Sequence, residues 1–391
     1  MSTASSSSST DWRAAARKPP AHRLNGKGDD SCRILTRLGI GLSVVVVACF
    51  IAMLAGLPND HECPPGAKDW PAYNSTPLSK PVELDDGSTV YTIAVVTDLD
   101  HESMSKDEKN AWLSFTKYGI LTVNKARSKA SVEWYEDKTL KLKSTISSGG
   151  RSMELSDFKV FDGHLISVDD RTGILYRIVD NSAVPWVILN DGPGLYGKAF
   201  KGEWLAAKNG LLYVGGLGKE WTTTEGVFVN HNPMWIKVVS HTGYIRHVNW
   251  VDNYKKLRSA AGITDPGYMI FESGQWSDIH GKWFFLPRRA SNEIYSEAAD
   301  ETKGTNLMLI ADEHFKHVEV RKVGKLTPPR GFSAFQFIPG TNDELIVALK
   351  SEEKDGVPVA SYITVFTVHG KVLMEETPLK GQFKFEGIEF V

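Results

Sequence analysis

The chain has 391 residues, of which 41% are hydrophobic and 24% are charged. This composition is typical of a globular protein and excludes fibrous folds and small disulfide-dense folds. The 45 Lys and Arg residues nearly balance the 47 Asp and Glu residues, which gives a formal net charge of −2. We therefore expect no nucleic-acid partner, because proteins that bind nucleic acid usually carry a basic footprint.

The N-terminal part of the sequence predicts a membrane anchor. Residues 1–37 are Ser-rich and polar, lack apolar periodicity, and are predicted to form a disordered cytoplasmic tail. Residues 38–57 contain no charge and are long enough for a transmembrane helix. Seven Arg and Lys residues precede this span, and Asp60 and Glu62 follow it. The positive-inside rule then predicts a single-pass type II signal anchor with the rest of the chain lumenal.

Residues 58–86 are rich in Pro, Asp, Ser and Lys and are predicted to form a lumenal stem. Asn74 begins an Asn-Ser-Thr sequon and is the predicted glycosylation site. The three cysteines are Cys32, Cys49 and Cys63, so we expect no disulfide within the folded domain. Cys63 is equally consistent with a disulfide between two chains, which would make a homodimer, and with a free stem thiol.

Residues 87–391 consist mostly of short apolar or alternating runs separated by turn residues, which predicts an all-β domain. Helices are expected only at 105–113 and 250–261, where the apolar spacing suits a helical face.

One strand–turn–strand unit recurs five times in this domain. Each copy places an oxygen-bearing residue before an apolar run, a tight turn such as Asp162-Gly163 or Asn209-Gly210, and a second strand. The spacing of these units, 47 to 69 residues, suits four-stranded blades and predicts a five-bladed β-propeller. Because the last copy ends with the chain, we expect residues 88–96 to complete its blade. The five oxygen positions are Ser156, Glu203, Glu272, Ser333 and Glu386.

Equivalent positions of propeller blades lie at the same radius, so these five residues would form a ring around the axis. Three carboxylates that face one another repel unless a cation lies between them. An oxygen-only ring suits a hard ion, and more than four protein oxygens favour Ca²⁺ over Mg²⁺. The alternative, that the five are ordinary polar residues at strand ends, stays open on this pattern alone.

Polar clusters follow several strands, where loops often carry function. Such loops would open on one face of a propeller and could bind phosphate through arginine forks. For any single loop, a solvated turn with surface ion pairs is the competing interpretation. The clusters are Asp98 with Asp100, Asp170 with Arg171, Lys219 with Glu220 and Trp221, and Arg288 with Arg289.

Other catalytic motifs are weak or absent in the sequence. The Gly-rich stretches 192–199 and 214–221 approach a phosphate loop but lack its Ser or Thr. The sequence contains no Gly-x-Ser-x-Gly, His-Glu-x-x-His or EF-hand pattern, which argues against serine hydrolases, zinc enzymes and EF-hand proteins.

Several long blocks closely resemble the calcium-activated nucleotidases of the apyrase family, over about residues 90–391. They include RSMELSDF, VDDRTG, LYVGGLGKEWTTT, WFFLPRRAS and FEGIEF. The anchor resembles that of the membrane-bound vertebrate form rather than the secreted salivary one. Two residues depart modestly from the family pattern: Ser152 stands where Gly is usual, and Ala334 where Ser is usual.

The resemblance implies a five-bladed propeller that requires Ca²⁺ and hydrolyses nucleoside diphosphates, with UDP and GDP preferred over ADP. It places calcium ligands at the same five oxygen positions, and we expect Asp157 to add a backbone or side-chain oxygen. We assign stabilisation of the transferred phosphoryl group to Arg288 and Arg171, and positioning or deprotonation of water to Asp98 or Asp100. The predicted substrate-binding residues are Asp170, Lys219, Glu220, Trp221 and Arg289, with Trp221 equally consistent with a core position.

These features predict a nucleoside diphosphatase in the membrane of the Golgi or endoplasmic reticulum, supporting glycosylation and proteoglycan synthesis. Whether the stem is cleaved to release a secreted form stays open. Two alternatives remain on the sequence. One is a non-catalytic binding module stabilised by calcium, and the other is a glycosidase with two carboxylates about 5–9 Å apart.

Overall fold

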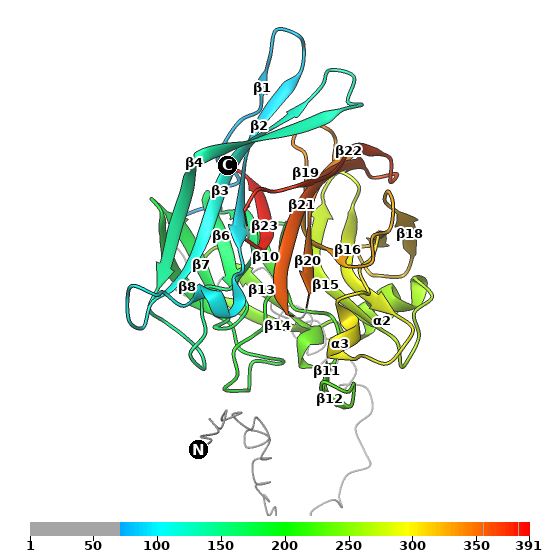
Figure 1. The fold of residues 1–391 in the computed structure, drawn as a ribbon. Helices are drawn as coiled ribbons and strands as arrows, with labels where there is room; N and C mark the ends of the chain where they lie inside the picture. The colour runs from blue at the N-terminus through cyan, green and yellow to red at the C-terminus, as the bar shows by residue number, and fades with distance from the viewer. Residues whose placement is uncertain (1–70, 355, 382) are drawn as a thin grey trace, which may run out of the picture. The chain divides into compact units, whose positions relative to one another are not determined.

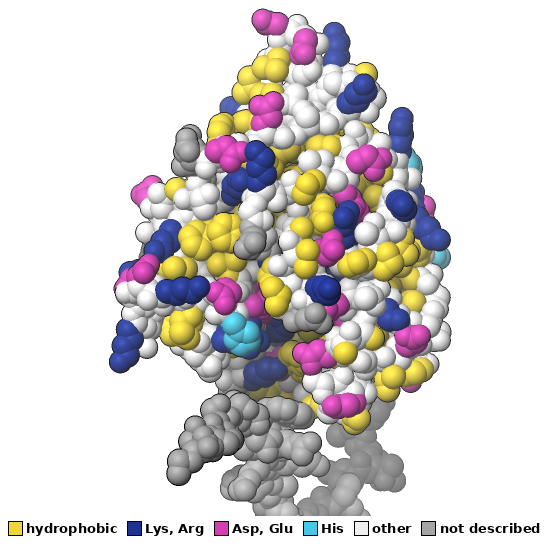
Figure 2. Space-filling view, in the orientation of Figure 1, with side chains coloured by type: hydrophobic (Ala, Val, Ile, Leu, Met, Phe, Trp, Pro, Cys, Tyr) yellow, Lys and Arg dark blue, Asp and Glu magenta, His cyan; other side chains and the backbone are white. Residues whose placement is uncertain are grey.

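Five antiparallel sheets are arranged around a common axis in the computed structural model, which describes residues 71–354, 356–381 and 383–391 (Figure 1). This confirms the prediction of an all-β, five-bladed propeller. Charged side chains of both signs are spread between apolar ones over the face in Figure 2, as the small net charge leads one to expect.

Each of the first four blades is built from four strands that follow one another in the chain. The first blade contains β5 (Leu155–Phe161), β6 (His164–Asp169), β7 (Ile174–Val179) and β8 (Ser182–Ile188). The second contains β9 (Trp204–Lys208), β10 (Leu211–Gly215), β13 (Trp235–Ser240) and β14 (Ile245–Asn249). The third contains β15 (Tyr268–Ser277), β16 (Lys282–Ser291), β17 (Leu307–Asp312) and β18 (Val318–Lys322). The fourth contains β19 (Arg330–Phe337), β20 (Leu345–Lys354), β21 (Val357–Thr367) and β22 (Val372–Pro378).

The fifth blade joins the two ends of the domain. Its inner strand is β23 (Phe385–Phe390), which pairs with β2 (Thr89–Thr97) and continues through β3 (Trp112–Val123) to β4 (Ala130–Ser144). The register pairs Ile93 with Phe390 and Val96 with Gly387. The predicted completion of the last blade by residues 88–96 is therefore confirmed. The inner strands contact one another in the order β5, β9, β15, β19, β23 and back to β5, so the ring is closed.

The predicted hairpin turns have the backbone geometry that their residues favour. Asp162 and Gly163 have φ of 52° and 70°, and Asn209 and Gly210 have φ of 51° and 69°. Two successive left-handed residues make a type I′ turn, whose twist matches that of the flanking strands, and Asp-Gly and Asn-Gly are its preferred pairs. These turns mark the end of the propeller where each inner strand finishes.

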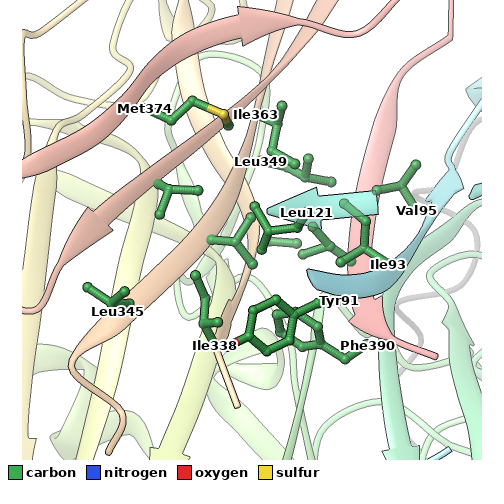
Figure 3. Close-up of a cluster of buried hydrophobic side chains, with 14 of the residues drawn as sticks. Tyr91, Ile93, Val95, Leu121, Ile338, Leu345, Leu349, Ile363, Met374 and Phe390 are labelled. Atoms are coloured by element: carbon green, nitrogen blue, oxygen red, sulfur yellow. The ribbon is translucent and has the colours of Figure 1, made fainter. Parts of the chain in front are cut away.

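Apolar side chains fill the space between neighbouring blades. Figure 3 shows one such cluster, in which the fifth blade packs against the fourth. Tyr91 and Phe390 meet edge to face with ring centroids 5.6 Å apart. Burying an aromatic or aliphatic side chain of this size stabilises the fold by about 1.5–3 kcal/mol. Ile93, Ile338 and Leu345 lie beside them, so the closing strands are held by burial as well as by hydrogen bonds.

One of the two predicted helices is confirmed and the other is wrong. Helix α2 (Val251–Ala260) buries Tyr254 and Leu257 against the second and third blades. At 105–113 the chain instead forms a turn after the short 3-10 helix η3 (Asp100–Ser103), and β3 begins at Trp112. The Ser105 hydroxyl accepts the backbone N–H groups of residues 107 and 108, and Asn110 is left-handed. Such local side-chain bonds compete with helix formation.

Residues 1–37, the predicted span 38–57 and Cys63 lie outside the described residues. Across the part of the chain that the structure describes, no helix is long and apolar enough to cross a membrane. Part of the predicted stem lies against the blades. Strand β1 (Val82–Glu83) pairs with β2, and the Tyr73 ring lies 5.2 Å from that of Phe161. Asn74, the predicted glycosylation site, is exposed beside the Asp162-Gly163 turn. The compact unit begins at Trp70 rather than after residue 86.

Candidate functional site

The five predicted oxygen positions all lie near the axis, toward the end where the inner strands begin. Ser156, Glu272, Ser333 and Glu386 lie in β5, β15, β19 and β23, and Glu203 directly precedes β9. In each of those four strands the pairing register shifts at the oxygen residue. A β-bulge re-aims a side chain and interrupts the alternation of faces. The bulges are thus the local feature that distinguishes these residues from ordinary polar residues of a strand.

Three of the five residues are carboxylates that disfavour one another's charge. Burial raises the pKa of Glu203 to about 8 despite the opposing effect of Lys201, and Glu272 adds to the rise. Burial also raises the pKa of Glu386 well above its usual range, although Lys384 and Arg288 oppose it. Such a group is most stable as anions when a cation lies among them.

Hydroxyl groups complete the set. Ser156 Oγ is buried and has no hydrogen-bond partner among the described residues, and Ser333 Oγ donates to the Phe385 carbonyl at 3.2 Å. Carboxylate and hydroxyl oxygens are the donors that calcium takes, so the residues present fit this ion. Asp157 has a different position. Its carboxylate accepts the backbone N–H groups of Phe158 and Leu205, each at 2.8 Å, and so ties β5 to β9.

Arg288 extends into this group from β16 and is 4% exposed. Its Nη1 donates to Glu386 Oε1 at 2.6 Å and also to Glu272, while its Nη2 donates to Glu353 Oε2 at 2.7 Å. The predicted catalytic arginine therefore contacts two of the predicted calcium ligands directly. Its neighbour Arg289 is also buried, and its Nη1 has no hydrogen-bond partner within the described part of the chain.

A second acidic group lies where β2 ends, β5 begins and β6 ends. Asp98, Glu154 and Asp170 each offer a carboxylate oxygen within 4.8 Å of the others, and all three are buried. Asp170 Oδ1 has no hydrogen-bond partner among the described residues. These three oxygens could also hold a cation, or they could hold a water molecule between them.

The three carboxyl groups differ in their electrostatics. Burial raises the pKa of Glu154 to about 8, and the charges of Asp170 and Asp98 contribute to the rise. Burial would raise the pKa of Asp98 too, but Lys384 and the Asp100 amide together hold it below its usual range. Asp98 therefore stays ionised, while Glu154 is the better proton acceptor near neutral pH.

Lysine and arginine side chains join the two acidic groups. Lys201 Nζ lies 2.8 Å from Glu203 Oε1 and also contacts Asp170. Lys384 Nζ lies 3.0 Å from Asp98 and 2.6 Å from Asp100. The site therefore alternates acids and bases, which is the arrangement expected where a phosphate chain and a cation bind together.

Sequence reasoning missed Glu154, Lys201 and Lys384, although a signal for them existed. Each lies two residues before one of the five oxygen positions. Because side chains two apart in a strand project to the same side, a residue at this spacing reaches the same end of the site. Glu353, at the end of β20, carried no comparable signal.

The remaining predicted residues lie at the rim. The Arg171 side chain is 34% exposed, and its Nε lies 3.7 Å from Glu154. Asp100 accepts from Arg151 at 3.2 Å and has a left-handed backbone with φ of 47°, which its N–H stabilises by donating to Asp98 Oδ1 at 2.8 Å. A non-glycine residue in this region is uncommon and is held by its surroundings.

A cavity of about 430 Å³ lies beside β11 (Trp221–Thr222) and β12 (Phe228–Asn230), at the end of the propeller that carries α2 and α3 (Glu297–Asp300) (Figure 1). Two predicted substrate-binding residues line it. Lys219 Nζ donates to Thr222 Oγ1 at 2.8 Å and lies 4.1 Å from the Tyr295 ring centre, and burial lowers its pKa to about 8. Glu220 lies 3.3 Å from Arg258 Nη1.

The cavity connects to the axial site through hydrogen bonds and charge. Tyr268, which lines the cavity, donates its hydroxyl to Asp300 Oδ1 at 2.6 Å. Asp300 in turn lies 3.9 Å from Arg289 Nε. Trp221 stands in β11 with the Lys198 ammonium 3.6 Å from its ring centre, so a charge covers one face of the indole. The site thus has three parts, an axial ring, an acid–base rim and a side cavity.

The chain is similar to known proteins over most of its length. The family model described as Apyrase matches residues 99–391. "Apyrase apy-1" of Caenorhabditis elegans is 54% identical over 309 residues, which is 79% of this chain and 86% of that protein. "Soluble calcium-activated nucleotidase 1" of Rattus norvegicus is 54% identical over 320 residues, 82% of this chain and 78% of that protein. An "Apyrase" of the insect Cimex lectularius is 44% identical over 82% of this chain and 87% of that protein.

Proposed function

Because this chain belongs to the apyrase family, we propose that it is a calcium-dependent nucleoside diphosphatase that converts UDP, GDP and, less well, ADP to the monophosphate and phosphate. Its family membership makes it a nucleotide-hydrolysing enzyme. The observation that carries the finer proposal is the convergence of five inner strands on an oxygen ring beside an acid–base rim. The rat relative's name, which includes calcium activation, supports the choice of ion.

The calcium ion would be held by Ser156, Glu203, Glu272, Ser333 and Glu386. When bound, it supplies positive charge and Lewis acidity next to the phosphate chain. Arg288 lies among these carboxylates and is therefore placed to bind a phosphoryl oxygen at the edge of the ring. A guanidinium that faces developing negative charge in a buried site typically contributes a factor of about 10²–10³ to the rate.

Arg171 and Arg289 are the further phosphate-binding residues that the geometry favours. Arg171 is partly exposed at the rim, and Arg289 has an unpaired Nη1 near Glu353 and Asp300. Lys201 and Lys384 hold the acids of the rim in place and keep them from repelling the substrate. Positioning and electrostatics of this kind account for most of catalysis in phosphoryl transfer.

The attacking water would be held by the cluster of Asp98, Glu154 and Asp170. Asp98 is fixed by Lys384 and accepts the Asp100 amide, so it can orient a water without changing its own position. Glu154 lies within 4.8 Å of Asp98 and Asp170 and can accept the proton at a carboxylate oxygen. This assignment extends the roles given to Asp98 and Asp100 from the sequence, because Glu154 was not recognised there.

The cavity lined by Lys219, Glu220, Arg258 and Tyr295 would hold the nucleoside. Uracil and guanine share a ring N–H beside a carbonyl, whereas adenine has no ring N–H on that edge. A carboxylate next to a guanidinium offers the complementary acceptor and donor, and the Tyr295 ring offers a stacking surface. This chemistry supports the preference for UDP and GDP over ADP.

Glu220→Gln tests this nucleoside site. We expect kcat/KM for UDP and GDP to fall about tenfold relative to ADP, because a charge-assisted hydrogen bond contributes about 1.5–3 kcal/mol. The measurement is the rate of phosphate release at low concentrations of each substrate, with Glu313→Gln as a surface control. An unchanged ratio of UDP to ADP would rule out this role.

The location of the enzyme is also a proposal. The uncharged span 38–57 supports a type II anchor, and the exposure of Asn74 supports glycosylation in a secretory lumen of the Golgi or endoplasmic reticulum. Hydrolysis of nucleoside diphosphates there would support glycosylation, since glycosyl transfer releases them. A shift in mobility on glycosidase treatment that Asn74→Gln abolishes would support this topology, and a shift unaffected by the substitution would oppose it.

The decisive experiment measures phosphate release by the purified full chain from UDP, GDP, ADP and UMP with Ca²⁺, with Mg²⁺ and with a chelator. We expect rapid release from diphosphates only when Ca²⁺ is present, and none from UMP. If no phosphate is released although Ca²⁺ raises the melting temperature, the protein is the calcium-stabilised binding module considered above.

A further inference from the structure

A second polar layer crosses the axis closer to the hairpin turns. Its members lie three residues after the five oxygen positions, namely Lys159, Ala206, Gln275, Gln336 and Glu389. In an undisturbed strand, residues three apart project to opposite sides. The bulges at the oxygen positions insert one extra residue, so residues on either side of them return to the same side. The repeat that makes the upper ring thus makes a lower one as well.

The ammonium group of Lys159 lies at the centre of this lower layer. Its Nζ lies 3.0 Å from Gln275 Oε1, 2.8 Å from Gln336 Oε1 and 3.5 Å from Glu389 Oε2. These partners come from β15, β19 and β23, whereas Lys159 itself comes from β5. Side chains from four of the five inner strands therefore converge on one cation.

The surrounding oxygens are fixed by further hydrogen bonds. Gln275 Nε2 donates to the Leu205 carbonyl of β9 at 2.9 Å, and Gln336 Nε2 donates to the Phe158 carbonyl at 3.2 Å. Glu389 accepts the backbone N–H groups of Val160 and Phe390 at 3.0 and 2.8 Å. The two amides must therefore direct their oxygens, not their NH₂ groups, toward the axis. Two amide oxygens and a carboxylate facing inward form a cage for a small cation.

We propose that this cage is a second axial cation site, that Lys159 occupies it permanently with its own ammonium, and that a small monovalent cation binds there once the lysine side chain is removed. The lysine also closes the axial channel beneath the upper ring. Ions would then reach the upper ring only from the end that carries the rim and the side cavity. This inference does not depend on the proposed enzymatic activity, because its test measures stability.

Lys159→Ala tests the proposal. With calcium held constant, we expect the variant to melt roughly 5–15 °C below the wild type in choline chloride, because the carboxylate of Glu389 loses its buried partner. Potassium, sodium or ammonium chloride at the same ionic strength should recover at least half of that loss, since these ions fit the cage and choline does not. The wild type should melt at the same temperature in all four salts.

Two further variants make the test specific. Lys159→Met fills the cage with an apolar side chain, so it should be destabilised without recovery in any salt. Adding Glu389→Gln to Lys159→Ala removes the carboxylate and should abolish the recovery. Lys380→Ala, which removes an exposed lysine paired with Glu136, is the control for loss of charge and should change little.

The outcomes that would overturn the proposal are equally definite. Equal melting temperatures of Lys159→Ala in potassium and choline chloride would do so, as would a Lys159→Met variant as stable as the wild type. If Lys159→Ala is unfolded as purified, its refolding yield is compared in the same salts. Recovery in potassium but not in choline supports the cage, and an equally low yield in every salt contradicts it.

Discussion

The upper and lower layers of the axis are built by the same five strands from equivalent positions of the repeat, yet they differ in electrostatic completeness. In the lower layer all three ammonium donors of Lys159 face oxygens, and each of those oxygens belongs to a group held by backbone atoms. In the upper layer Ser156 Oγ has no partner among the described residues, and burial raises the pKa of Glu203 to about 8.

The difference teaches that the propeller repeat fixes where side chains meet, while residue identity decides whether they need an external ion. The lower layer carries its own cation and is complete without a ligand. The upper layer gathers three carboxylates around the axis, and the cations that contact them, Arg288, Lys201 and Lys384, also contact acids outside the ring. A layer of this kind is suited to bind and release ions and substrates, whereas the lower layer is suited to hold the barrel of inner strands together.

Removal of Arg288 should break the upper layer most strongly. Without calcium, Arg288→Met leaves Glu272, Glu353 and Glu386 buried without this partner, which should lower the free energy of unfolding by about 3–5 kcal/mol. Saturating calcium should offset much of that loss, but kcat should still fall about 10²–10³-fold. Urea unfolding with and without calcium measures the first effect, and saturating turnover the second.

Arg330→Met is the matched control for this experiment. Arg330 also pairs with two carboxylates, Glu352 and Glu376, but its side chain is 26% exposed and lies outside the axial ring. We expect a smaller loss of stability that calcium does not change. Normal turnover of the Arg288 variant, or an equal response of both variants to calcium, would remove Arg288 from the proposed site.

The charge of Glu203 should set how much calcium the upper layer needs. Glu203→Gln removes one anionic ligand and frees Lys201 from one of its two partners. We expect the calcium concentration at half-maximal activity to rise about 10–100-fold, which corresponds to about 1.4–2.8 kcal/mol. Calcium titration of phosphate release measures this, with Glu313→Gln as a control. A variant with the wild-type calcium requirement would contradict the axial ring.

Acid should stabilise the calcium-free upper layer. Burial raises the pKa of Glu154 and of Glu203 from about 4.5 to about 8, so between these values the folded protein binds more protons than the unfolded chain. The free energy of unfolding then decreases as pH rises through this window. Calcium competes with those protons, so its stabilising effect should be larger at pH 8 than at pH 5. Urea unfolding in chelator and in calcium at both values checks the sign.

Much of this comparison could be predicted from the sequence, and the missing part has a definite cause. The five oxygen positions and the turn at Asp162-Gly163 follow from the repeat, because an equivalent position in each blade means an equal radius. Lys159 and its partners could not be found by period-two reasoning, since the bulge that re-aims Ser156 also shifts the alternation after it. Glu353 reaches Arg288 from the far end of β20, a contact that only the tertiary arrangement creates.

The smallest effect is expected when the lower layer is weakened without removing its cation. Gln336→Leu deletes one oxygen of the cage, 2.8 Å from Lys159 Nζ, and the hydrogen bond to the Phe158 carbonyl. The loss should be about 1–2 kcal/mol, because Gln275 and Glu389 still face the ammonium. The calcium requirement of activity should change less than twofold, since the upper ring keeps all its ligands. A large rise in that requirement would mean that the two layers are coupled through the inner strands, and that the lower layer positions the upper one as well as closing the channel.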